Sequence, residues 1–126
     1  MKIVFFILAF LVACSGDSGE LKSQEAEKTV IDNLRVEIKA MAVLSECSEE
    51  YMCYSVGVGA KPCGGFWEYI IYTGSIDMTD FLAKIETLNE LEKKYNEKYM
   101  IQSDCFMAMP PSSIDCVDGK CVGTFQ

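Results

Sequence analysis

Hydrophobic residues recur at helical spacing in two stretches of the chain. In the first, from about Glu27, apolar residues at steps of three and four predict a helix that ends near Ser45. Alternation of apolar and polar residues over residues 34–38 leaves a strand as the alternative. The apolar face of this helix consists of Val30, Ile31, Leu34, Ile38, Met41 and Leu44.

The second stretch predicts a longer amphipathic helix, from Asp77 as its N-cap to about Lys98. Charged residues occupy the opposite face, where Glu90 and Lys94 form a favourable pair four residues apart. Because a two-stranded sheet is marginally stable alone, we expect this helix to cover the hairpin that precedes it. Its apolar face consists of Phe81, Leu82, Ile85, Leu88, Leu91 and Tyr95.

Two runs between these helices have the character of strands. Residues 51–58 are aromatic and β-branched, and residues 66–73 are apolar on both alternate faces. The second run therefore predicts a central strand that is covered on both sides. The turn Cys63-Gly64-Gly65 separates the runs, and its glycines allow a tight reversal, so we predict an antiparallel hairpin.

The C-terminal tail carries the strongest hairpin signal of the chain, the turn dipeptide Asp118-Gly119. A two-residue turn there places Cys116 opposite Cys121, so a cross-strand disulfide is one of the possible pairings. Pro110-Pro111 separates this hairpin from a further apolar run. The strands expected in the tail cover residues 105–109, 114–117 and 120–124.

Together these elements predict a small α+β domain over residues 27–126. Antiparallel β-hairpins are packed by one long amphipathic helix, and a second helix lies at the N-terminal side. We find no internal repeat and no low-complexity segment.

The first residues have the pattern of an export signal. Lys2 precedes an uncharged apolar run over residues 3–12, which is too short to span a membrane as a helix. The run closes with Leu11-Val12-Ala13-Cys14, and this resembles the lipobox of bacterial lipoproteins. The alternatives are a plain secretory signal cut after Ala13 and a membrane-spanning segment.

The lipoprotein resemblance implies a signal peptide over residues 1–13 and acyl chains, such as palmitate, carried by Cys14. Two or more chains are needed, because a single chain binds a membrane only reversibly. Small and polar residues then make residues 14–26 a flexible tether. The protein would be anchored in the cell envelope. Ser15 after the cysteine favours the outer membrane of a Gram-negative cell.

The cysteine count agrees with export to an oxidising compartment. Six of the seven cysteines follow Cys14, an even number that predicts three disulfides with 15 possible connectivities. No pair has the C-x-x-C spacing of redox proteins, and the chain has no histidine, so we predict no metal and no cofactor. An all-cysteine metal site is the alternative. The six cysteines are Cys47, Cys53, Cys63, Cys105, Cys116 and Cys121.

The formal net charge of −8, without a basic cluster, argues against nucleic acid as a partner. Residues 57–61 have a weak likeness to a phosphate-binding loop, but Pro62 follows where a helix should start. Ser55 and Lys61 form a conceivable catalytic pair, although nothing distinguishes them from ordinary loop residues. Pairs of carboxylates, such as Glu49 and Glu50, fit a solvated turn better than an acid–base pair.

Glu68 is the only acid in a strongly apolar strand, so burial there would raise its pKa; a water-facing edge position is the alternative. Aromatic residues around it form either the core or a binding surface. Trp67 and Tyr69 are the first residues to test for a ligand, with Glu68 beside them. The whole group is Tyr51, Tyr54, Phe66, Trp67, Tyr69 and Tyr72.

Residues 45–122 resemble a group of small cysteine-rich bacterial lipoproteins of unassigned function. The resemblance rests on Lys61-Pro62-Cys63-Gly64-Gly65, on Ser103-Asp104-Cys105 after Tyr95-Asn96, and on Cys116-Val-Asp-Gly-Lys-Cys121. It implies no activity. We therefore expect a non-catalytic binding or inhibitor module for an envelope or extracellular protein. The alternatives are a small envelope enzyme, either a hydrolase or thiol-dependent, and a structural envelope accessory.

Overall fold

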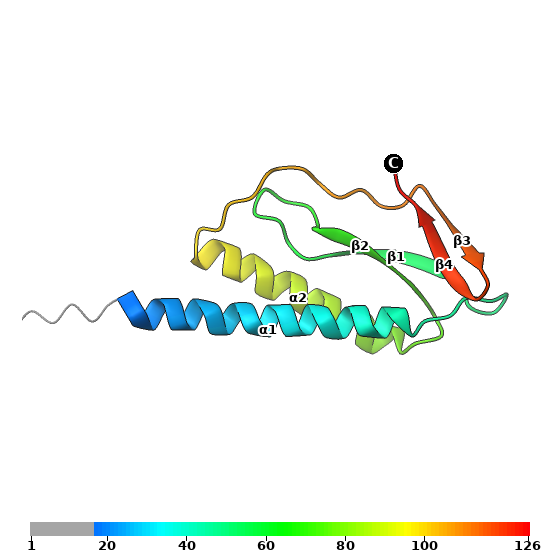
Figure 1. The fold of residues 1–126 in the computed structure, drawn as a ribbon, viewed down its shortest axis with the longest axis horizontal. Coiled ribbons are helices and arrows are strands. Elements are labelled where there is room, and N and C mark those ends of the chain that lie inside the picture. Colours follow the sequence, from blue (N-terminus) through cyan, green and yellow to red (C-terminus); the bar gives the residue numbers. More distant parts are fainter. Residues whose placement is uncertain (1–16) are drawn as a thin grey trace, which may run out of the picture.

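The computed structural model describes residues 17–126. Two helices and two β-hairpins follow one another along the chain (Figure 1). In this described part of the chain, strands pair only within each hairpin and form two separate two-stranded antiparallel sheets. This confirms the predicted α+β class and both hairpins. The elements are α1 (Asp17–Val43), β1 (Cys53–Val58), β2 (Glu68–Thr73), α2 (Met78–Lys98), β3 (Ser113–Val117) and β4 (Lys120–Thr124).

Helix α1 begins ten residues earlier than expected, at Asp17 instead of Glu27. Residues 17–26, predicted as part of a flexible tether, are helical. Contacts with α2 fasten this end: Gln24 Nε2 donates to the Tyr95 hydroxyl at 3.2 Å, and Lys98 pairs with Glu27. The Lys98 hydrogen bond holds the pKa of Glu27 below its ordinary value. Residues 19–26 are mostly exposed, which fits their polar composition.

Helix α2 follows the prediction closely. The Asp77 side chain caps it by accepting a hydrogen bond from the backbone N–H of Asp80 at 3.0 Å. Its buried residues are Phe81, Ile85 and Leu88.

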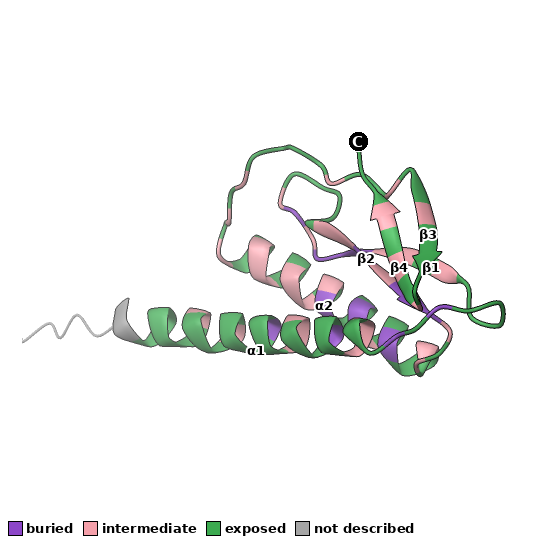
Figure 2. Ribbon diagram, turned by 45° about the vertical axis from the view of Figure 1, so that its right-hand side comes forward, coloured by how far each residue is buried: buried purple, intermediate pink, exposed green. Residues whose placement is uncertain are grey.

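The core lies between the two helices and one face of the first hairpin (Figure 2). On that face Val58 and Ile70 are buried, and the Tyr72 ring packs against Phe81 with the ring centres 4.9 Å apart. Burial raises the pKa of the Tyr72 hydroxyl. The core residues are Ile31, Ile38, Val58, Ile70, Tyr72, Phe81, Ile85 and Leu88.

Strand β2 is not the central strand that its sequence predicts, because within residues 17–126 it pairs with β1 alone. It is apolar on both faces for a different reason: the second hairpin covers the face that the helices leave open. There Ile71 meets β4 at Gly123, where a side chain would collide with it. Packing of one hairpin on another thus gives the same pattern as a central position in a larger sheet.

Three disulfides join the six cysteines of the domain, which confirms the prediction from their number. Cys116 does face Cys121 across the second hairpin, but the two are not bonded to each other. Instead Cys47 bonds Cys116 and Cys53 bonds Cys121. The two bridges fasten the second hairpin to the segment between α1 and β1 and to the first residue of β1. The third bridge joins Cys63 to Cys105.

The strand expected at residues 105–109 is absent. From Ile101 to Pro111 the chain runs without a turn, a bend or pairing to another strand. Figure 1 shows this extended segment along the side of the molecule opposite α1. The residues have strand character, but no neighbouring strand of the described part of the chain reaches them.

Candidate binding surface

The structure separates the three residues that the sequence proposes as a ligand surface. Glu68 faces α1, where it pairs with Arg35 at 3.1 Å and with Lys39 at 3.0 Å. Tyr69 lies on the opposite sheet face and packs edge-on against Phe66, with ring centres 5.9 Å apart. Because neighbouring side chains of a strand alternate between faces, Glu68 and Tyr69 do not form one surface. Trp67 precedes the strand and is partly exposed.

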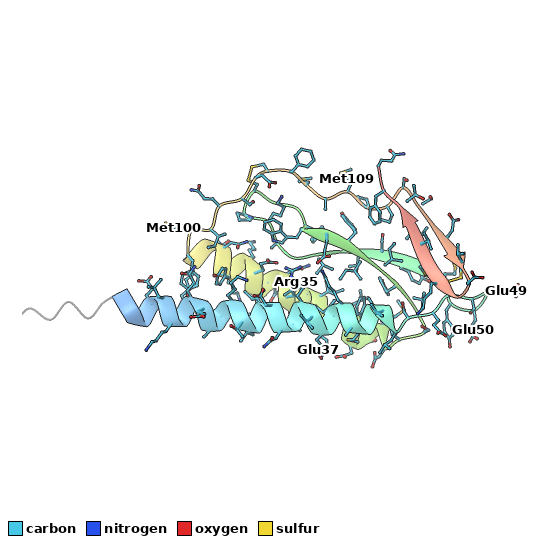
Figure 3. The ribbon with its side chains drawn as sticks, in the orientation of Figure 1. Arg35, Glu37, Glu49, Glu50, Met100 and Met109 are labelled. Carbon is cyan, nitrogen blue, oxygen red and sulfur yellow. A yellow bond between two sulfur atoms is a disulfide. The ribbon has the colours of Figure 1, made fainter. Side chains whose placement is uncertain are left out.

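Arg35 is the centre of the charge cluster that holds Glu68. Arg35 extends from α1 (Figure 3). Its guanidinium pairs with Glu68 of β2 and with Glu92 of α2, the latter at 2.9 Å. Glu92 in turn accepts the backbone N–H of Ala60 at 2.9 Å. Glu68 therefore links α1 to the hairpin as a paired carboxylate, which is a structural arrangement.

The loop after β1 is fastened to α2 in the same way. The N–H of Gly59 donates to Asn89 Oδ1 at 2.6 Å, and Asn96 Nδ2 donates to the Ala60 carbonyl at 2.7 Å. In a phosphate-binding loop, the N–H groups of Gly59 and Ala60 would have to meet the anion. Here they already donate to Asn89 and Glu92 of α2.

Lys61 leaves this loop as a buried cation. Its side chain is only 6% exposed, and its ammonium donates to Asp104 Oδ1 at 2.7 Å and to the Phe106 carbonyl. The ammonium also lies 4.7 Å from the centre of the Trp67 ring, a cation–π distance. The Lys61 hydrogen bond holds the pKa of Asp104 below its ordinary value, and the Phe106 N–H, which Asp104 also accepts, adds to the effect.

These contacts position the extended segment at its middle. The Cys63–Cys105 disulfide and the Lys61–Asp104 pair join consecutive parts of it to the same loop. The Phe106 carbonyl accepts from Lys61 of that loop, and the Phe106 N–H donates to Asp104 within the segment. The Phe106 side chain points into solvent and is 85% exposed.

Phe106 belongs to a group of exposed apolar side chains that we name the apolar ridge. Met107 packs over Gly65, next to Phe66, so the extended segment and the first hairpin contribute to one surface. Met109 lies further along the segment (Figure 3). The ridge consists of Phe66 (36% exposed), Phe106 (85%), Met107 (54%) and Met109 (64%).

Sequence reasoning did not single out Phe106 or the methionines. The signal was the run Phe106–Pro111, which contains no polar side chain in a chain of net charge −8. Strand character suggested that these residues would be covered by a neighbour. Of the aromatic residues that it did single out, only Tyr72 is in the core; Tyr51, Tyr54, Phe66 and Trp67 are exposed.

Two open grooves flank the first hairpin. One of about 480 Å³ lies between α2 and the loop after β1, beside Phe66, and it extends the ridge with mainly apolar walls. The other, about 530 Å³, lies between the end of α1, β2 and β4. Its charged residues have partners: Lys39 binds Glu68, and Lys120 donates to the Val43 and Ser45 carbonyls at the end of α1.

The cysteine sulfurs are the remaining reactive groups. Those of Cys47, Cys53 and Cys121 lie within 4.8 Å of one another, a spacing that a metal ion could bridge. Each is already bonded to another sulfur, so the group is two adjacent disulfides, and residues 17–126 contain no free thiol.

Cys14, the predicted site of lipid attachment, lies outside the described residues. Within residues 17–126, no helix combines the length and the apolar character needed to cross a membrane. Comparison with models of known protein families, with curated proteins and with solved structures gave no match.

Proposed function

We propose that this chain is a lipid-anchored protein of the cell envelope that acts by binding another protein, and that the apolar ridge is its contact surface. Aromatic and methionine side chains dominate the buried centres of protein interfaces. Clusters of them in water mark interaction sites, because exposing apolar surface is unfavourable. Phe106, the most exposed large side chain of the domain, is the expected anchor.

The observation that best supports this proposal is that Phe106 is 85% exposed on a segment held in place by a disulfide and an ion pair. Cys105 is bonded to Cys63, and Asp104 is paired with a buried lysine, so both residues before Phe106 are held. Binding loses less conformational entropy when the contact residues are ordered beforehand. A rigid segment with an exposed apolar side chain is well suited to recognition, including the inhibition of a partner enzyme.

The membrane anchor is the second part of the proposal. The lipobox-like residues Leu11-Val12-Ala13-Cys14 support lipid on Cys14, and Ser15 supports delivery to the outer membrane in a Gram-negative cell. Helix α1 starts at Asp17, three residues after that cysteine. The lipid would therefore be joined almost directly to a helix, which limits how far the domain can move from the membrane surface.

A cross-linking pull-down from intact cells tests the contact surface. We expect wild-type protein to capture a partner and Phe106→Ser to lose it, with unchanged circular dichroism and thermal midpoint. Val36→Ser is the matched control, since Val36 is also an exposed apolar residue but lies on α1, opposite the extended segment. Equal capture by both variants would remove the ridge from consideration.

Cys14→Ala tests the anchor in the same cells. The protein should move from the membrane fraction to the soluble fraction, and mass spectrometry of the wild type should find acyl chains on Cys14. An unlipidated protein that fractionates as the variant does would contradict the lipoprotein assignment.

A further inference from the structure

The extended segment has the properties of a strand that lacks a partner. Residues 101–111 contain no helix, turn or bend, and none of them has a positive φ. Within residues 17–126, no hydrogen bond occupies the backbone groups of Met107, Ala108 or Met109. Unpaired backbone groups in an extended chain are a template for pairing with another strand.

The direction of the free edge follows from Phe106. In an extended chain, backbone polar groups of residues two apart point to the same side. Since the carbonyl of Phe106 turns inward to the buried Lys61, the backbone groups of Ala108 turn inward as well. The N–H and C=O groups of Cys105, Met107 and Met109 then point outward. Pro110 ends this edge, because proline has no N–H to donate.

We propose that an extended segment of the partner protein adds as a strand along residues 105–109, alongside the apolar ridge. This inference rests on the proposed function and describes how the partner is recognised. Main-chain hydrogen bonds supply the pairing, and apolar side chains select the sequence, as in other cases of strand addition.

The chemistry of the segment defines the partner. Residues 105–111 carry no charge, so the side chains of the added strand that contact them should be apolar. Among apolar residues, β-branched and aromatic ones fit a pleated surface best. The chain as a whole is acidic, with a formal net charge of −8. The added segment should therefore lack Asp and Glu and tolerate Lys or Arg at its ends.

A proline scan combined with a displayed peptide library tests the proposal. The probe is a random twelve-residue library on phage, selected against the oxidised domain. We expect enriched peptides to be apolar and poor in Asp and Glu. Met107→Pro and Met109→Pro, which each delete an outward N–H, should weaken their binding by about tenfold or more. Ala108→Pro is the matched control, since it deletes an inward N–H, and should bind as the wild type does.

Three results would overturn strand addition: no enriched peptide, enriched peptides that bind as helices, or equal binding by all three proline variants. Sedimentation of the domain alone tests whether a second copy of this chain, instead of a partner protein, pairs with residues 105–109. If the wild type is a dimer and Met107→Pro is a monomer, the added strand comes from a second copy. Capture from cells separates the two proposals. If Phe106→Ser abolishes capture while Met107→Pro retains it, the ridge remains the contact surface and strand addition is wrong.

Discussion

The ammonium of Lys61 lies 2.7 Å from Oδ1 of Asp104, and the two side chains are in opposite environments. Lys61 is buried, with 6% of its side chain exposed, whereas 74% of the Asp104 side chain is in water. The buried lysine of the hairpin loop thus binds an exposed residue of the extended segment. Beside the Cys63–Cys105 disulfide, this ion pair is a second attachment of the extended segment, and it depends on the charge of one carboxylate.

Acidification should release this contact. The pKa of Asp104 is lowered in the folded protein, so the stabilisation is complete above the ordinary value of 3.8 and is lost as the pH falls through the lowered value. Urea unfolding of the wild type and of Asp104→Asn should differ near neutral pH and converge at low pH. A difference between the two that is independent of pH would contradict the role of this charge.

Local signals predicted most of the elements, since their causes lie within a few residues. Asp77 caps α2 as expected, and Asp118 and Gly119 both have positive φ, as the two-residue hairpin turn requires. The first turns of α1 were missed because their support is distant in sequence: Gln24 and Glu27 contact α2 residues 71 positions away. A polar sequence with such contacts is indistinguishable from a linker.

The candidate site was harder to predict for the same reason. Alternation along the strand predicts that Glu68 points to the opposite face from Trp67 and Tyr69, but it does not predict which face meets water. That depends on the second hairpin, whose position is fixed by the pairing of Cys47 with Cys116 and of Cys53 with Cys121. The number of cysteines sets the number of disulfides and leaves their pairing open. Phe106 is exposed because no strand of residues 17–126 pairs with its segment, and its local sequence does not predict that.

Truncation to alanine should lower the free energy of unfolding far more at Phe81 than at the neighbouring apolar residue Leu82. Phe81 is fully buried against Tyr72, so Phe81→Ala should lower the free energy of unfolding by about 3–5 kcal/mol. Leu82 is partly exposed on the same turn of α2, and Leu82→Ala should cost much less. Urea denaturation monitored by circular dichroism measures both. Equal losses would contradict the placement of the core.

The Phe66 ring depends on the absence of a side chain at position 57. A Cβ atom at Gly57 would overlap that ring, so Gly57→Ala must displace it, with an expected cost of about 1–3 kcal/mol. The displaced ring should also alter the near-ultraviolet circular dichroism. Gly19→Ala is the control: it meets no atom within 4 Å in α1, and it should stabilise the protein slightly. An unchanged spectrum for Gly57→Ala would contradict the packing of Phe66 over this glycine.

The two adjacent disulfides should exchange when one partner is removed. In Cys116→Ser, the released Cys47 thiolate lies within 4.8 Å of both sulfurs of the Cys53–Cys121 bridge. Attack on either sulfur forms a new bond to Cys47 and expels the other cysteine as a thiolate, with no net oxidation or reduction. Peptide mapping without reductant should therefore find Cys47 bonded to Cys53 and to Cys121. Cys105→Ser is the control. It releases Cys63, whose sulfur is not in the group formed by Cys47, Cys53 and Cys121, so the other two bridges should remain as they are. A Cys116→Ser protein with only the Cys53–Cys121 bond would show that the sulfurs are not positioned for exchange.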